Sequence, residues 1–304
     1  MSGMKFPITL ISQQTKFDFI SKRWLGFAFS LALIVGTFIL LAVRGLNYGI
    51  DFSGGILMEV KTAGTSDIAQ FRSALDKAGI KGASLQNIGG SASILIRFQA
   101  RPEENQQEKI NEVKNVLNAS FPGLEYRKVD FVGPQVGGEL ARRGFYAVAA
   151  AMLAIMVYLW FRFDWQFGLG GVVALFHDVI ATIGFYAVTR LEFDLTTIAA
   201  LLTIIGYSIN DSVVIYDRIR ENIRKYKKKS LPELINLSVN ETLSRTVLTA
   251  GTVFVACLAL GLFGGEVLKS FSFGMLFGII VGTYSSVYIS APVLLYTNVR
   301  KESE

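Results

Sequence analysis

The sequence predicts an α-helical polytopic membrane protein with six transmembrane helices and one small α+β domain between the first two. Three observations lead to this fold class. Of the 304 residues, 51% are hydrophobic and only 18% are charged, whereas a soluble chain carries about 25% charge. Six apolar runs approach the roughly 20 residues that a membrane-spanning helix requires. The one long segment between such runs, residues 44–142, alternates in the manner of strands and amphipathic helices.

The chain is expected to open with a short tail, residues 1–23, and a first span at 24–43. Lys22 and Arg23 precede this run, as basic residues precede the apolar core of a signal peptide. The run is too long for the apolar core of such a peptide, however, and no clear small-residue cleavage site precedes Arg44. We therefore expect a retained membrane anchor.

The other five spans fall within a transmembrane region at 143–296, which is followed by a tail at 297–304. Their apolar cores lie at 145–161, 167–188, 195–216, 247–263 and 271–296. A basic loop, residues 217–244, separates the fourth span from the fifth. Six spans place both termini on the same side of the membrane.

The basic residues set the orientation. The formal charge is +6, and much of the local excess lies in residues 218–229, beside a span. Lysine and arginine accumulate in cytoplasmic loops, so we expect this loop and both termini to be cytoplasmic and residues 44–142 to lie outside. The same distribution argues against a domain built to bind nucleic acid.

The outer segment is expected to form a ferredoxin-like domain in the order β-α-β-β-α-β. Its strands are predicted at 56–62, 83–88, 92–98 and 124–132, with helices at 66–78 and 103–117 and a turn at Gly89-Gly90. It contains no histidine or cysteine, which favours a binding or mechanical module. Glycines and a proline mark its two joints with the membrane region, and these are either simple turns or hinges, at Gly54, Gly55, Gly133 and Pro134.

Asp211 stands out because it interrupts the apolar fourth span. A carboxylate at the centre of a membrane helix costs roughly 2.5–3.5 kcal/mol even on lenient scales. Its expected counterpart is a polar stripe on the fifth span that reaches a similar depth, namely Thr242, Arg245, Thr249 and Thr252. Asn210 adjoins the aspartate. The residues alone allow two interpretations, a static ion pair or a site that binds and releases protons.

His177 and Asp178 form a second polar pair, about 18 Å into the third span at the helical rise. A single histidine in a membrane helix is often a packing residue with a hydrogen-bond partner. Intramembrane histidine and aspartate also recur in proton relays. Both interpretations remain open from the sequence.

Five stretches together resemble the SecF-like proteins of the SecD/SecF family, within the resistance–nodulation–division superfamily. They occur in the family's order and are LNYGIDFSGG (46–55), FVGPQVGGEL (131–140), ALFHD (174–178), GYSINDSVVIYDRIREN (206–222) and NETLSRT (240–246). The resemblance implies six spans with one outer domain, a multi-pass protein of the bacterial inner membrane, and a proton-conducting role for Asp211 and Arg245. It also implies a heterodimer with a SecD-like subunit, contact with membrane lipid, and work with the Sec translocation channel, its SecA motor and a translocating preprotein.

The expected function is therefore a proton-driven accessory subunit of protein export. We expect no covalent enzyme chemistry and no cofactor, with protons as the coupling ion. Two alternatives stay open: a small-molecule/proton antiporter of the same superfamily and a passive membrane scaffold. Members of the first class generally carry twelve spans and two larger outer domains, whereas the second predicts that Asp211 can be neutralised without loss.

Overall fold

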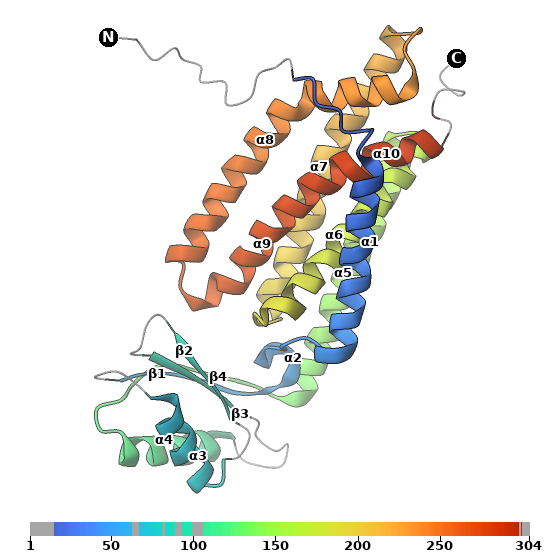
Figure 1. The fold of residues 1–304 in the computed structure, drawn as a ribbon. Helices are drawn as coiled ribbons and strands as arrows, with labels where there is room; N and C mark the ends of the chain where they lie inside the picture. The colour runs from blue at the N-terminus through green and yellow to red at the C-terminus, as the bar shows by residue number, and fades with distance from the viewer. Residues whose placement is uncertain are drawn as a thin grey trace, which may run out of the picture.

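The computed structural model describes residues 15–62, 67–80, 83–88, 93–98, 106–297 and 299. Helices α1, α5, α6, α7, α8 and α9 run side by side as a bundle, and the small domain lies at one end of it (Figure 1). The described segment before the first helix and the last described turn lie at the opposite end. The expected turn at Gly89-Gly90 and the first residues of the helix expected at 103–117 lie outside the described residues.

The prediction of six spans is confirmed, because six helices in the described part of the chain are long and apolar enough to cross a membrane. A π-helical turn and two short helical pieces, Ser286–Ser290, Ala291–Val293 (α10) and Leu294–Tyr296, extend the last span. The bundle helices are α1 (Arg23–Arg44), α5 (Pro134–Arg162), α6 (Trp165–Thr189), α7 (Leu195–Lys225), α8 (Leu231–Phe263) and α9 (Glu266–Ser285).

The segment expected to be a basic loop, residues 217–244, is instead largely helical. Helix α7 continues to Lys225 and α8 already begins at Leu231. A capping box starts α8 early, because the Ser230 and Glu233 side chains each bond the other's backbone N–H. Hydropathy detects only the apolar part of a helix. The prediction therefore ended α7 too early in the chain and began α8 too late.

Small residues let the bundle helices approach closely. Gly274, Gly278 and Gly282 recur along one face of α9. A Cβ added at Gly274 would lie 2.0 Å from the hydroxyl oxygen of Tyr186, and one at Gly278 would lie 2.3 Å from a methyl carbon of Ile204. This is the small-residue packing that membrane helices use in place of a hydrophobic driving force.

The small domain contains one antiparallel sheet with the strand order β2-β3-β1-β4. Two helices cover one face of the sheet (Figure 1). The chain order is β1 (Gly55–Lys61), α3 (Ile68–Lys77), β2 (Ser84–Ile88), β3 (Ser93–Phe98), α4 (Gln106–Ser120) and β4 (Glu125–Val132). Alternate strand residues such as Ile56, Met58 and Ile96 are fully buried against these helices, which is the period-2 pattern of a half-buried sheet.

Both connections between the domain and the bundle lie side by side. Gly55 at the start of β1 faces Val132 at the end of β4. A short helix that the sequence did not predict, α2 (Ile50–Ser53), precedes Gly54. Gly54 has φ 69° and Gly55 has φ 126°, a region that side-chain-bearing residues rarely adopt. On the return path Gly133 caps α5 and Pro134 begins it.

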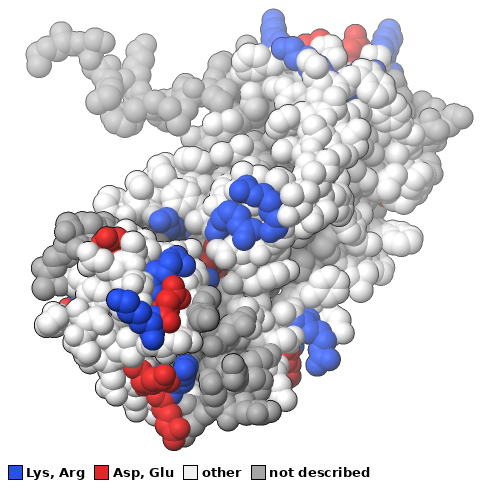
Figure 2. Space-filling view, turned by 60° about the horizontal axis from the view of Figure 1, so that its bottom comes forward, with Lys and Arg blue, Asp and Glu red and all other residues white. Residues whose placement is uncertain are grey.

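The open face of the sheet lies against the near end of the bundle. Arg97 on β3 forms an ion pair with Glu192, in the loop between α6 and α7. A cleft of about 590 Å³ between the two parts is lined by Leu57, Leu95 and Asp194 among others. Charged side chains gather on the small domain and at the ends of the bundle, and the flank between them is uncharged (Figure 2).

Candidate functional site

Asp211 lies inside the bundle, on the buried face of α7, with only 3% of the residue exposed. Among the described residues, its Oδ2 atom has no hydrogen-bond partner. Buried polar atoms are ordinarily hydrogen-bonded, because leaving them unpaired costs the full free energy of desolvation. An unpaired carboxylate oxygen at this position therefore indicates a functional site.

The surroundings of Asp211 come from three helices. Arg245 and the Thr246 hydroxyl, both on α8, lie close enough to act on its carboxyl group. Tyr207, one turn away on α7, also experiences the charge of Asp211 and lies near the hydroxyl of Thr283 on α9. The oxygens of all three hydroxyl groups are buried and make no hydrogen bond to a described residue. Four unpaired polar atoms thus gather in one part of the bundle.

Arg245 itself is exposed on the flank of α8. Among the ion pairs within 4.0 Å that the described residues form, none joins Arg245 to Asp211. The arginine is therefore an electrostatic neighbour of the carboxylate and not its contact partner. A close static ion pair, one of the two interpretations of the sequence, is absent from this arrangement.

The remaining predicted residues of this region are three threonines of α8 and Asn210 of α7. The Thr249 hydroxyl is half-buried and donates to the Arg245 carbonyl of its own helix at 2.9 Å. Thr242 and Thr252 also donate to carbonyls of α8. Asn210 is exposed on the flank of α7. Arg245 thus acts on Asp211, whereas the Thr249 hydroxyl bonds its own helix and Asn210 is exposed.

His177 and Asp178 are both buried in α6, and their side chains contact each other. The distance between His177 Nδ1 and Asp178 Oδ1 is 2.9 Å. The other carboxylate oxygen, Oδ2, accepts hydrogen bonds from Ser208 of α7 and from Ser285 of α9, the latter at 2.8 Å. This second polar centre therefore joins three helices.

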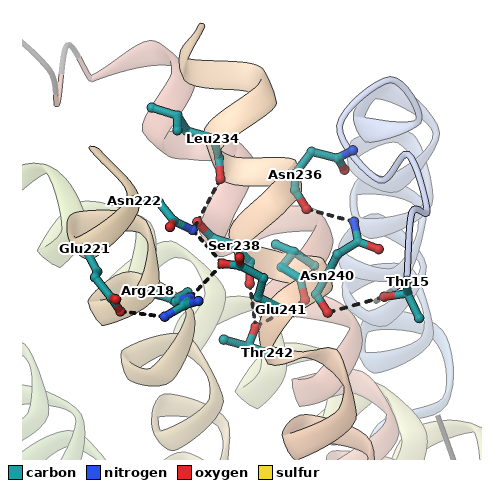
Figure 3. Close-up of polar contacts among 11 residues, drawn as sticks. Thr15, Arg218, Glu221, Asn222, Leu234, Asn236, Ser238, Asn240, Glu241 and Thr242 are labelled. Carbon is teal, nitrogen blue, oxygen red and sulfur yellow. Dashed lines mark hydrogen bonds and ion pairs between the residues drawn. The ribbon is translucent and has the colours of Figure 1, made fainter. Parts of the chain in front are cut away.

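A polar network links α7 and α8 at the end of the bundle that lies away from the small domain (Figure 1 and Figure 3). Glu241 of α8 accepts hydrogen bonds from Arg218 at 2.6 Å and from Asn222 at 2.7 Å, both on α7. Asn222 also donates to Ser238 at 2.9 Å. Glu241 lies one helical turn before Arg245, so the network fixes the relative positions of the helices that carry Asp211 and Arg245.

The segment before α1 is bound to the same part of α8. The Asn240 side chain accepts from the Phe17 N–H and donates to the Phe17 carbonyl, both at 2.8 Å. The Asn236 side chain accepts from the Phe19 N–H at 2.9 Å. Figure 3 shows two further hydrogen bonds of Asn240: its carbonyl accepts from the Thr15 hydroxyl at 3.3 Å, and its side-chain amide donates to the Asn236 carbonyl at 2.8 Å. Asn240 and Glu241 in the NETLSRT stretch therefore have structural roles.

Sequence reasoning missed Tyr207, Thr246 and Thr283 near Asp211, Ser208 and Ser285 beside Asp178, and Glu241 in the polar network. A hydroxyl in a membrane helix usually bonds the carbonyl one turn earlier, so threonines give no signal of their own. Thr246 lies one position away from the stripe on which Arg245 and Thr249 were noted. Nothing in the sequence distinguishes Glu241 from Glu221 and Glu233, the other acidic residues between 218 and 245.

Two family descriptions match the chain. The family "Protein export membrane protein SecD/SecF, C-terminal" matches residues 112–300. The "SecD/SecF GG Motif" matches residues 39–65, which include α2, Gly54 with its positive φ, and β1, which begins at Gly55.

Curated relatives and a solved structure agree with these matches. The chain is 53% identical to Protein translocase subunit SecF of Rickettsia akari over 290 residues, covering 95% of this chain and 94% of the relative. It is 52% identical to the subunit of the same name from Rickettsia bellii, with 95% and 96% covered. The crystal structure of SecDF from Thermus thermophilus, described as a translocon-associated membrane protein, matches with a TM-score of 0.85 and 35% identity. That match covers 95% of this chain but only 39% of the SecDF chain. Sequence, fold and relatives agree, and the chain belongs to the SecD/SecF family of protein export membrane proteins, among its SecF-type members.

Proposed function

We propose that the chain is a proton-driven accessory subunit of the Sec protein-export machinery, in which Asp211 is the group that binds and releases the proton. A carboxylate can be protonated at physiological pH values, whereas arginine stays charged. Proton binding would switch Asp211 between a charged and a neutral state while Arg245 keeps its charge. The coupling ion is the proton, and the proposal requires no covalent catalysis and no cofactor.

The observation that carries the proposal is the unpaired buried oxygen of Asp211 beside three unpaired hydroxyls. A purely structural carboxylate would be expected to accept hydrogen bonds from these neighbours. Groups that must exchange a proton need a free lone pair at some stage. Thr249 and Asn210 have a lesser place in the proposal, because their side chains do not point to this centre.

A SecD-like subunit is the proposed partner, packed against the flank formed by α7 and α8. Arg245 is exposed there, and a charged side chain on a membrane helix almost always faces protein or a water-filled cavity. The neighbouring exposed positions of α7 are small or polar, which suits contact with another helix: Ala199, Thr203, Gly206 and Asn210. The greater length of the SecDF chain supports the same arrangement, since this chain covers only 39% of it.

The proposed location is the bacterial inner membrane, with both termini cytoplasmic and the small domain outside. The basic turn between α7 and α8 lies at the bundle end opposite the small domain (Figure 1), which supports this orientation through the positive-inside rule. We class the domain as ferredoxin-like, because its strand order, read from the other edge, is β4-β1-β3-β2. The Sec channel, the SecA motor and the translocating preprotein complete the proposed assembly.

The test is precursor translocation into membrane vesicles, with and without an uncoupler, at matched protein levels. Asp211→Asn preserves the shape of the side chain and removes its titration, so we expect loss of the uncoupler-sensitive part of export while the ATP-driven part persists. Arg245→Met should give a similar loss. Asp217→Asn serves as the control, because this acidic residue of the same helix is already paired with Arg162 at 2.8 Å.

The double variant Asp211→Asn/Arg245→Met separates proton coupling from a structural pair. Replacing both members of a structural pair is often tolerated, so a scaffold would recover its export activity. Uncoupler-sensitive export equal to wild type in the double variant would overturn the proposed role of Asp211.

A further inference from the structure

His177 and Asp178 lie where membrane lipid does not reach them. Asp178 is fully buried and only 2% of His177 is exposed. His177 is also the single histidine of the chain. Ionisable groups at such a depth are expensive and generally serve a function.

The hydrogen bonds define the state of this pair. Asp178 accepts from His177 Nδ1, from Ser208 and from Ser285. The Ser285 hydroxyl also lies 3.1 Å from the Gly282 carbonyl and has one proton for the two acceptors. With His177 Nδ1 and Ser208 as donors, the carboxyl group of Asp178 is ionised, because a carboxylate can only accept. With Nδ1 as the donor, the neutral imidazole carries its free lone pair on Nε2, as assigned from the hydrogen-bond network. This Nε2 atom is buried and has no partner among the described residues.

The helices around the pair bring few other charges. Helices α1 and α5 carry charged residues only near their ends. In α7, α9 and the π-helical turn, apart from the charged residues near the helix ends, the titratable side chains are Tyr207, Asp211 and Tyr216 on α7, Tyr284 on α9 and Tyr288 in the π-helical turn. The Tyr284 ring lies 6.1 Å from the His177 ring, and its hydroxyl donates to the Gly26 carbonyl at 2.6 Å.

Helix α7 links the pair to Asp211. Ser208, which donates to Asp178, precedes Asp211 by three residues and therefore lies on the same helix face, about 4.5 Å away along the axis. The backbone of α9 is held close at this point, since a Cβ added at Gly282 would lie 3.2 Å from Ser208 Cβ. Ser285 then leads directly into the π-helical turn, a feature frequently found at functional sites.

We infer that His177 and Asp178 form a second proton-binding site that is coupled to Asp211 through Ser208 on α7. The proton adds to the lone pair of His177 Nε2, and no covalent bond of the protein breaks. The pair changes from a net charge of −1 to a neutral imidazolium–carboxylate pair. This inference rests on the proposed proton-driven function, because it makes Asp211 one of two communicating sites.

The single histidine makes the test specific. The full chain, carried by a tag without histidine and labelled with ¹³C and ¹⁵N only at histidine, is reconstituted in lipid nanodiscs with its unlabelled partner. The ring signals are followed by NMR from about pH 5 to about pH 9, which spans the ordinary range of histidine titration. We expect one reversible titration in the wild type. In Asp211→Asn the midpoint should differ from that of the wild type, because a charge that acts on the imidazole is removed.

Asp217→Asn is the matched control, since it removes the same carboxylate six residues further along α7, about 9 Å away by helical rise. Its titration should equal that of the wild type. A ring that stays in one protonation state throughout, or a midpoint that is the same in Asp211→Asn and wild type, overturns the inference. The export assay is independent of this result. A shifted midpoint together with normal uncoupler-sensitive export in Asp211→Asn would reject the proposed function and keep the coupling between the two sites.

Discussion

At the scale of single residues, unpaired polar atoms are more informative than charges. Asp211 could be predicted from the sequence because a carboxylate in an apolar run is costly. Thr246 could not, because only packing shows that its buried hydroxyl lacks a partner, whereas Thr242 bonds the carbonyls of its own helix. The residue types of the site were thus accessible from the sequence, and their contacts were not.

Thr246→Val tests the role of this hydroxyl with a side chain of nearly equal shape. A hydrogen bond to a charged group contributes roughly 1.5–3 kcal/mol. If the Thr246 hydroxyl forms such a bond in only one of the two states of Asp211, we expect uncoupler-sensitive export to fall about 10- to 150-fold. Thr242→Val is the matched control and should retain export, because its hydroxyl serves the helix backbone. Equal export by Thr246→Val and wild type would exclude Thr246 from the coupling site.

At the scale of elements, the junction between domain and bundle explains the glycines of the FVGPQVGG stretch. Gly137 lies against α2, and a Cβ there would lie 3.0 Å from the Phe52 carbonyl oxygen and 3.1 Å from the Gly54 nitrogen. At Gly138, the next residue of α5, an added Cβ would meet nothing within 4 Å. The sequence suggested turns or hinges for this region, and α2 could not be predicted because four residues carry no detectable period.

These neighbouring glycines provide a matched pair of substitutions. Gly138→Ala should leave the chain equally stable or raise its stability by about 0.5–1 kcal/mol, because alanine is the better helix former. Gly137→Ala should lower stability by about 1–3 kcal/mol, since backbone atoms of α2 must move. Thermal unfolding in detergent measures both changes. Similar melting temperatures for the two variants would show that α2 does not pack on α5 as described.

At the scale of the whole molecule, the sequence predicted the number of membrane helices but not how the domain rests on them. Hydropathy reports the length of apolar runs and strand alternation reports one buried face, and both are local properties. The Arg97–Glu192 pair joins residues far apart in sequence, and no sequence pattern predicts it. Burial lowers the pKa of Arg97, an effect that the nearby Asp194 opposes, and arginine remains charged at all physiological pH values.

Charge reversal tests whether this pair holds the domain against the bundle. A cysteine is introduced by Leu95→Cys in the cleft, in a chain with Cys257→Ala, and its reaction with an impermeant maleimide is timed. Arg97→Glu or Glu192→Arg alone should speed labelling about tenfold, which corresponds to ~1.4 kcal/mol, because like charges then replace a half-buried ion pair. The two changes together should restore the wild-type rate. Lys109→Glu is the control, since its pair with Glu112 lies on α4, and faster labelling in that variant would point to general loosening of the domain.

The side-by-side connections of the domain also decide how it would respond to force. Both tethers leave from the same end of the β1–β4 pair, where Gly55 faces Val132. A pull along the tethers therefore loads the first rung of the ladder alone, then Ile56 against Phe131, and so on. Strands loaded in this way unzip one hydrogen-bonded pair at a time, whereas strands pulled from opposite ends must shear all their bonds at once. The domain is thus mechanically soft towards traction along its two tethers.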